Sequence, residues 1–251
     1  MKMHALSGGR LRMKARAFNA AASSDETIDL PCCCFLLRHS QGNVLFDTGC
    51  HPSVATNAEA RWGSVTRSVK PVMAPDDNVI TALSSIGLVP DDIDLVVNSH
   101  LHMDHCGCNS FFRKATNIVH ERELAAARES EGKGYFSADW DCGMQTQTIE
   151  DEVDLFNDGK IILIPVPGHS AGTIGALVTL DRDGMIFLAA DSVSVESNLR
   201  AETIPANTWN TDLFARSIAT VRNLETRGAR IFYGHDAEQW KGLRKGLHAY
   251  Q

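Results

Sequence analysis

The segment SHLHMDHCGCN, residues 99–109, constrains this chain more than any other stretch because it concentrates side chains that bind metal ions. His100, His102, Asp104 and His105 fall within six residues. With 10 histidines and 31 acidic residues among 251, such a cluster is expected by chance far less than once. His100 and His102 alternate, so in an extended segment both face the same side, whereas the last two fall where the chain turns. The spacing indicates one ion held by the first pair and a second ion held by Asp104 and His105, each still short of ligands.

Further candidate ligands follow predicted strands elsewhere in the chain. His169 comes just after the apolar run Ile161–Val166, Asp191 directly after Ile186–Ala190, and His235 just after Arg230–Tyr233. Loops at strand ends are where a rigid scaffold presents functional groups. Nitrogen and oxygen ligands of this kind suit zinc, and they also suit iron, cobalt or manganese. The sequence therefore predicts a site for two divalent transition-metal ions, with zinc favoured and with Asp191 as the candidate bridge.

The remaining pattern alternates short apolar runs with amphipathic segments, which predicts an α/β fold in one domain, residues 1–251, of two similar halves. A short basic strand pair is expected around Ser7-Gly8-Gly9-Arg10, and residues 130–152 are expected to form a long surface excursion because they are polar and lack a period. The other expected strands are Cys32–Leu37, Asn43–Phe46, Ile93–Val97, Lys160–Val166, Ile174–Leu180, Met185–Ala190 and Arg230–Tyr233, and the expected helices are Asp76–Ser85, Glu121–Glu129 and Thr211–Arg227.

Charge and composition exclude several functions. A net charge of -7 argues against a surface that follows nucleic-acid phosphates, and no apolar run approaches the roughly 20 residues of a membrane span. No secretory signal is indicated, so a cytoplasmic location is expected. The seven cysteines form an odd set, and Cys32–Cys34 lie in an apolar run. We expect these three to be reduced core thiols, since they lie far from the candidate ligands in the sequence and have no histidine or carboxylate spacing of their own.

The motifs SHLHMDH, PGHSAGT, AADS and YGHD, in this order, resemble those of the metallo-β-lactamase superfamily. The resemblance spans about 200 residues, from LPCCCFLL and LFDTG to the final GHD. It implies a four-layer αββα sandwich with the site at one edge, between the sheets. It also implies an ion at His100, His102 and His169, a second ion at Asp104, His105 and His235, and Asp191 as the bridge.

Within the superfamily, LPCCCFLL, RWGSV, GLVPDDIDLVVNSHLHMDH and YGHDAEQW resemble the N-acyl-homoserine-lactone lactonases, the quorum-quenching subgroup. This implies a small-molecule lactone or related ester as substrate, opened by attack of a metal-bridging hydroxide, and is compatible with a homodimer. One departure bears on the substrate. Those lactonases usually have a tyrosine three residues after the bridging aspartate, where this chain has Ser194.

Several roles follow as expectations. Asp104 is the candidate proton shuttle to the leaving alkoxide, and Met103 and Ser194 are candidate substrate contacts. Cys106 and Cys108 are expected to pack rather than bind metal, because the site is complete without them. Phe136, Trp140 and Met144 could cover an acyl chain. The alternative function is that of a metal-dependent phosphoesterase or phosphotriesterase, whereas purely structural ions are disfavoured because such sites are typically closed and rich in cysteine.

Overall fold

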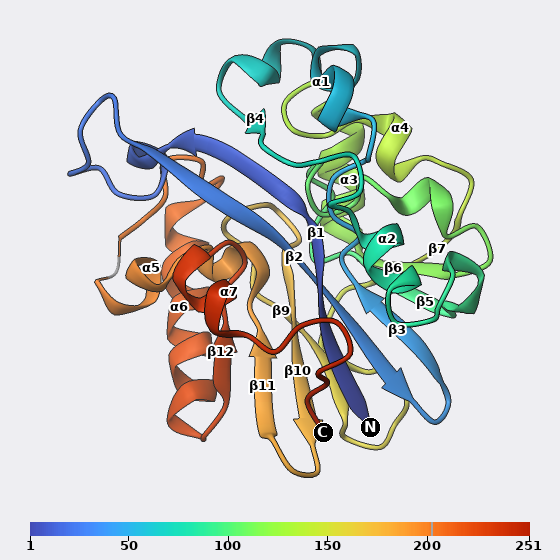
Figure 1. Ribbon diagram of the computed structural model, residues 1–251. Coiled ribbons are helices and arrows are strands. Elements are labelled where there is room, and N and C mark those ends of the chain that lie inside the picture. The colour runs from blue at the N-terminus through green and yellow to red at the C-terminus, as the bar shows by residue number, and fades with distance from the viewer. Residues whose placement is uncertain (202) are drawn as a thin grey trace.

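The computed structural model describes residues 1–201 and 203–251, and it contains two β-sheets that lie face to face (Figure 1). The first sheet has the order β4-β1-β2-β3-β5-β6-β7, and its strands are β1 (Lys2–Lys14), β2 (Thr27–His39), β3 (Gly42–Phe46), β4 (Lys70–Pro71), β5 (Leu95–Val97), β6 (Thr116–His120) and β7 (Gln145–Ile149). The second sheet has the order β12-β11-β10-β9-β8, and its strands are β8 (Val153–Asp154), β9 (Ile161–Pro165), β10 (Ile174–Leu180), β11 (Gly184–Leu188) and β12 (Arg230–Phe232).

The main core fills the space between the two sheets. Along β2 the side chains alternate between the two faces, as the pleat of a strand requires. Phe35 and Leu37 point into the space between the sheets, where they join Leu163, Val178 and Leu188 of the second sheet. Cys34 and Leu36 belong to a separate core on the outer face of the first sheet. Both faces of β2 are therefore buried, which explains its nearly continuous apolar sequence.

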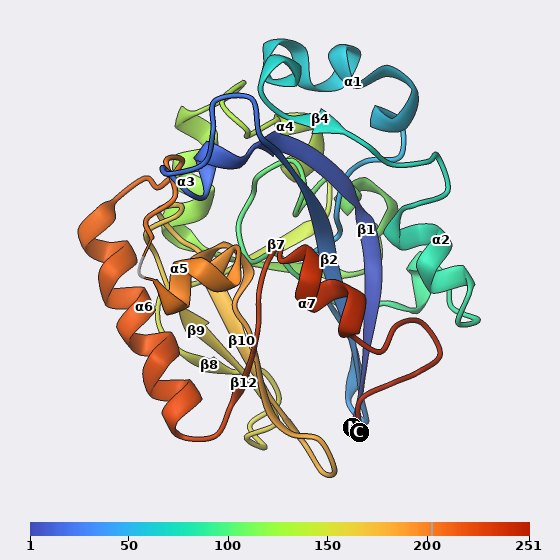
Figure 2. The same cartoon turned by 60° about the vertical axis from the view of Figure 1, so that its left-hand side comes forward.

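Helices cover both outer faces of this sandwich. The helices are α1 (Val54–Trp62), α2 (Val79–Ser84), α3 (Glu121–Glu129), α4 (Ser137–Trp140), α5 (Glu196–Arg200), α6 (Thr211–Thr226) and α7 (Ala237–Gly242), with 3-10 turns at Ala15–Ala17, Gly63–Arg67, Pro90–Asp92, Asn109–Phe111 and Ala190–Val193. Helix α6 buries a stripe that includes Phe214, Ile218 and Val221 against the second sheet, and Asn210 caps its N-terminus by accepting from the Leu213 amide. Figure 2 shows α6 on one side of the sheets and α2 on the other. The predicted four-layer αββα sandwich is confirmed.

The structure corrects two sequence predictions. The expected strand pair around Ser7-Gly8-Gly9-Arg10 is wrong, since β1 is one strand whose register with β2 shifts between Ser7 and Arg10. Residues 130–152 are not a structureless excursion, because they contain α4 and the parallel edge strand β7. Most of β7 is exposed, so it carries no apolar alternation, and its backbone hydrogen bonds to β6 hold it.

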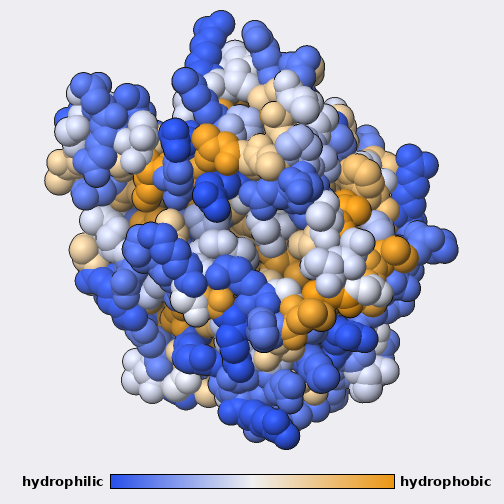
Figure 3. Space-filling view, in the orientation of Figure 1, coloured by the Kyte–Doolittle hydropathy of each residue, from blue (hydrophilic) through white to orange (hydrophobic). Residues whose placement is uncertain are grey.

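The surface is largely hydrophilic in the view of Figure 3, with apolar residues in separate patches. Few large apolar side chains of the described residues are exposed, among them Trp209 and Leu247. Of the helices described, none is both long and apolar enough to span a bilayer.

Candidate metal centre

The candidate ligands meet at one edge of the sandwich because several strands end there. β5 ends at Val97, and the loop that follows carries the histidine cluster. In the second sheet β9, β11 and β12 run in the same direction, so their carboxyl ends lie at one edge. The chain leaving these three strands supplies His169, Asp191 and His235, respectively. The structure thus brings all seven predicted ligands together, from residues up to 135 positions apart in the sequence (His100 to His235).

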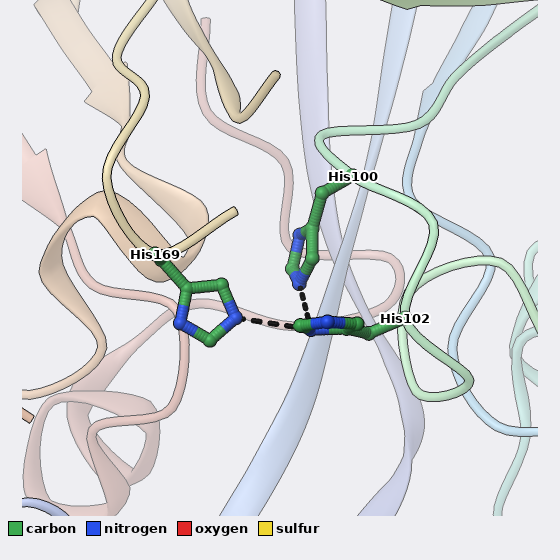
Figure 4. Close-up of side chains that lie close together, drawn as sticks. All are labelled: His100, His102 and His169. Atoms are coloured by element: carbon green, nitrogen blue, oxygen red, sulfur yellow. Dashed lines mark hydrogen bonds between the residues drawn. The ribbon is translucent and has the colours of Figure 1, made fainter. Parts of the chain in front are cut away.

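Three histidines form the first group. The Nδ1 atom of His102 lies 2.9 Å from Nε2 of His100 and 3.0 Å from Nε2 of His169 (Figure 4). The other ring nitrogen of His100 is held by the Ser99 hydroxyl at 3.0 Å. With the facing nitrogen of each ring unprotonated, all three can direct a lone pair toward a common point. Such an arrangement fits a cation at that point.

The second group combines imidazoles with carboxylates. Nε2 of His105 lies 3.2 Å from Nε2 of His235, 3.8 Å from Oδ2 of Asp104 and 3.7 Å from Oδ1 of Asp191. Nε2 of His235 lies 3.6 Å from the same Asp104 oxygen. Four ligand atoms around a tetrahedral zinc ion, at 2.0–2.1 Å from it, are spaced about 3.3 Å apart. Both the spacing and the chemistry of this donor set fit a divalent ion.

Asp191 stands between the two groups. Its Oδ2 lies 3.3 Å from Nε2 of His169, and its Oδ1 lies 2.9 Å from Nε2 of His235. The carboxylate is buried, and Oδ1 has no partner of good hydrogen-bond geometry. A buried charge without a complete set of partners is costly unless a cation compensates it. Asp191 therefore offers one oxygen to each group.

The two groups of ligands also differ in the pKa shifts of their histidines. Burial lowers the pKa of His102 and of His169 to about 4, so these rings are neutral, as a metal ligand must be. Burial also opposes the charge on His105, but the carboxylates of Asp104 and Asp47 outweigh it and raise its pKa to about 9. For Asp191, burial is outweighed by His235 and His169, which hold its pKa well below the usual value. The carboxylates of Asp47, Asp104 and Asp191 all lie within 4 Å of the His105 ring nitrogens.

Asp47 orients the second group. It follows β3, and its Oδ2 accepts from Nδ1 of His105 at 2.8 Å, while Oδ1 accepts from the Ser99 amide at 2.7 Å. A carboxylate on the far nitrogen fixes the tautomer and direction of a ligating imidazole. Asp47 also has φ 61°, which an aspartate adopts rarely and at some cost in strain. The sequence prediction missed this residue, although its place in DTG at the end of a strand was a usable signal.

Glu123 of α3 joins the loop of the histidine cluster to the loop that carries His169. This residue is 0% exposed and accepts four hydrogen bonds. Oε1 accepts from the Leu101 amide and the Tyr135 hydroxyl, and Oε2 accepts from the Ser170 hydroxyl and the Gly172 amide. The pattern of helix Glu121–Glu129 did not single out Glu123, because acidic residues on a short helix are usually exposed.

Close backbone packing keeps the ligand loops in place. A Cβ added to Gly234 would lie 2.6 Å from the Ala190 carbonyl oxygen and 2.7 Å from Oδ1 of Asp191. Ala190 itself has φ 45°, a strained conformation directly before the bridging candidate. The backbone at Gly234 therefore packs directly against Ala190 and the Asp191 carboxylate, and there is no room for a methyl group between the two loops.

A cavity of about 300 Å³ opens onto the two groups. Asp104, which has 14% of its side chain exposed, lines this cavity, and so does Met103, whose contact with a substrate stays a prediction. Ser194 does not line it in the described part of the chain: it is fully buried, and its carbonyl accepts from the His235 amide at 2.7 Å. The other lining residues are mostly apolar, and none of them was predicted from the sequence to line the site: Leu11, Met13, Phe18, Leu30, Val65, Ser68, Val69, Lys133, Gly134 and Asn207.

Phe136, Trp140 and Met144 do not line this cavity in the part of the chain that is described. Phe136 is buried in a core with Met103, Trp140 packs on a small core around Leu101, and Met144 packs near α2. These three apolar residues attach residues 130–152 to the hydrophobic cores instead of lining the cavity.

The cysteines are all free thiols. Cys106 and Cys108 are fully buried and donate to the carbonyls of Leu101 and Cys50, and neither belongs to a cluster of candidate ligands among the described residues. Cys32 is different. Its Sγ lies within 4.8 Å of ligand atoms of Asp104 and His235, although Cys32 is far from both in the sequence. Strand β2 places Cys32 beside the site. Its distance from the ligands along the sequence does not reveal this.

Fold and site together define a class: an αββα sandwich whose loops gather two sets of nitrogen and oxygen ligands around one shared carboxylate. The chain belongs to the metallo-beta-lactamase superfamily, whose family model matches residues 27–244.

Several proteins similar to this chain are N-acyl homoserine lactonases. The N-acyl homoserine lactonase AttM of Azorhizobium caulinodans is 30% identical over 254 residues, which cover 98% of this chain and 97% of that protein. The N-acyl homoserine lactonase AiiA of Bacillus thuringiensis subsp. kurstaki is 28% identical, over 97% of this chain and 96% of that protein. A solved N-acyl homoserine lactone hydrolase with the product N-hexanoyl-L-homoserine at its catalytic metal centre superposes with a TM-score of 0.91, at 27% identity, over 99% of this chain and 98% of that one.

Proposed function

We propose that this protein hydrolyses N-acyl homoserine lactones, or closely similar small lactones, at a centre of two divalent metal ions. The observation that carries the proposal is Asp191, whose two oxygens face separate groups of ligands beside an apolar cavity. His100, His102 and His169 would hold one ion, and Asp104, His105 and His235 the other. Zinc is the ion we favour, because imidazole and carboxylate ligands at these spacings suit it. The similarity to N-acyl homoserine lactonases over nearly the whole chain supports the same substrate class.

Two bound ions would polarise the lactone carbonyl and lower the pKa of the attacking water. The remaining work falls to side chains. Water adds to the carbonyl carbon, the ring C–O bond breaks, and the proton lost by the water must reach the leaving alkoxide. Asp104 suits this transfer, because it lines the cavity and is the most exposed carboxylate of the site. The product is the ring-opened hydroxy acid.

The apolar wall explains how an acyl chain would be held. Leu11, Phe18 and Val69 line the cavity, together with Met103 of the histidine loop. Burying a chain here gains about 25 cal/mol per Å² of apolar surface, and few polar groups have to be desolvated. An uncharged acyl lactone suits such a lining. The phosphoesterase alternative has no observation of its own in its favour.

The experiment is a hydrolysis panel with the metal-loaded chain: N-hexanoyl and N-decanoyl homoserine lactone, followed by chromatography of the ring-opened acids, and an aryl phosphotriester. We expect lactone opening to dominate. Asp104→Asn keeps the size of the side chain but cannot carry the proton, so kcat should fall by about 10²–10⁴ even in protein shown by elemental analysis to hold both ions. Asp25→Asn is the control, because that side chain is 99% exposed. Turnover of the phosphotriester without lactone opening would contradict the proposal.

A further inference from the structure

Cys32 lies where the strand β2 passes the second group of ligands. Its Sγ, a carboxylate oxygen of Asp104 and a ring nitrogen of His235 all lie within 4.8 Å of one another. Cys32 is only 1% exposed, so no bulk water competes for the thiol. The residue before it is tied to the same site, because the Pro31 carbonyl accepts from Nδ1 of His235 at 2.8 Å and leaves Nε2 of that ring facing the two aspartates.

The backbone is irregular at this position. Pro31 pairs with Arg10 and Cys33 pairs with Ser7, so the single residue Cys32 stands opposite two residues, Gly8 and Gly9. A bulge of this kind bends the strand and redirects a side chain, and bulges are frequent beside active sites. A side chain at Gly8 would not fit in this bulge, since an added Cβ would lie 2.6 Å from Sγ of Cys34 and 3.0 Å from the Cys32 carbonyl oxygen. The fold therefore departs from a regular ladder at the residue that reaches the site.

The other thiols form a contrast. Cys33 and Cys34 belong to the cores on the two faces of the first sheet, whereas Cys32 and Cys50 belong to a third core that includes Leu11 and Met103. Cys50 touches Cys32, with 3.6 Å between the two sulfur atoms, but it is not part of a ligand cluster in the residues described. Of the seven cysteines, Cys32 alone joins a cluster of candidate ligands within the described ranges.

We propose that Cys32 is a further ligand of the ion held by Asp104, His105 and His235. The inference rests on the proposed two-ion centre and adds a thiolate to it. Zinc binds thiolate, imidazole and carboxylate alike. The step is balanced: the S–H bond of Cys32 breaks, a sulfur–metal bond forms, and the proton passes to the buffer. A soft thiolate would favour zinc and cobalt over manganese at this position.

Cobalt makes the sulfur–metal bond visible. The full-length chain is loaded with two equivalents of Co²⁺, the bound ions are counted by elemental analysis, and the near-ultraviolet spectrum is recorded against the metal-free chain. We expect a thiolate-to-cobalt charge-transfer band. Cys32→Ala should abolish this band, whereas Cys50→Ala should keep it. Cys50 is the matched control, because it is the buried neighbour of Cys32 and loses the same atom.

Affinity supplies a second readout. Removing a group that merely supports a ligand typically weakens metal binding about 10–100-fold, so losing a direct ligand should cost at least that much. Competition with a chelator should show this loss for the second ion in Cys32→Ala and no change in Cys50→Ala. Two bound cobalt ions without a charge-transfer band in the unsubstituted chain would overturn the thiolate ligand and leave the lactonase proposal standing. A band that persists in Cys32→Ala would also overturn it. Failure to bind two ions would overturn the two-ion centre itself.

Discussion

Oδ2 of Asp47 lies 2.8 Å from Nδ1 of His105, on the side of the ring that faces away from the other ligands. This contact decides which nitrogen of His105 is free for a metal ion. Replacing Asp47 with Asn keeps the shape, and Asn tolerates the positive φ of this position, so the backbone is not strained further.

We expect Asp47→Asn to weaken the second ion about 10–100-fold, because the carboxylate no longer fixes the imidazole. Chelator competition measures this, with Asp25→Asn as the exposed control. Binding of both ions with unchanged affinity would mean that the Ser99 hydroxyl, which lies 3.4 Å from the same nitrogen, suffices to orient His105.

Asp191→Ala removes the carboxylate shared by the two groups. Two cations would then face each other without the anion between them, so we expect at least one ion to be lost and lactone turnover to fall to the background. Elemental analysis after gel filtration measures the ion content. If Asp191→Ala kept two ions per chain, another group would have to bridge them.

Glu123→Gln tests the support beneath both ligand loops. The amide retains one acceptor oxygen but turns an NH₂ group toward amide or hydroxyl donors, which leaves buried groups unpaired at a cost of about 1–3 kcal/mol. Thermal unfolding should show a Tm lowered by about 2–4 °C per kcal/mol in a chain of this size. Glu129→Gln is the control, since Glu129 is exposed on the same helix. Equal Tm values for both variants would show that this hub contributes nothing to stability.

Val65→Trp should change the preference for acyl chains. Val65 lies on the apolar wall of the cavity, and a larger ring there takes up room that a long chain would use. We expect the ratio of kcat/KM for N-decanoyl over N-hexanoyl homoserine lactone to fall about tenfold, in line with the 1–3 kcal/mol that small changes in an apolar pocket typically give. Val89→Trp, at a position 54% exposed, should leave the ratio unchanged. A shift of similar size in both variants would place the acyl chain elsewhere.

Features that depend on residues close together in the sequence could be predicted from it, whereas features that depend on contacts between distant residues could not. The ligand motifs were visible because strands β9, β11 and β12 each end just before a histidine or an aspartate, and that is a local pattern. The sandwich was predicted from a resemblance carried by the same motifs. The cavity walls were not predicted, because Leu11, Phe18 and Val65 meet only through the pairing of β1 with its neighbours.

Cys32 and Glu123 show the same limit in another way. Each looks ordinary in its segment, a thiol in an apolar run and an acid on a helix. Their significance comes from partners more than 20 residues away: Asp104 and His235 for Cys32, and Leu101 and Gly172 for Glu123. Neither relationship has a signature in the local sequence.

The most direct test of the account is a metal titration of lactone hydrolysis. Metal-free chain is titrated with Zn²⁺, and the initial rate of N-hexanoyl homoserine lactone opening is measured at each ratio of ion to chain. The account predicts little activity without metal and a rate that rises until two ions are present per chain, then stays level. A plateau at one ion per chain, or no lactone opening with two ions bound, would contradict it.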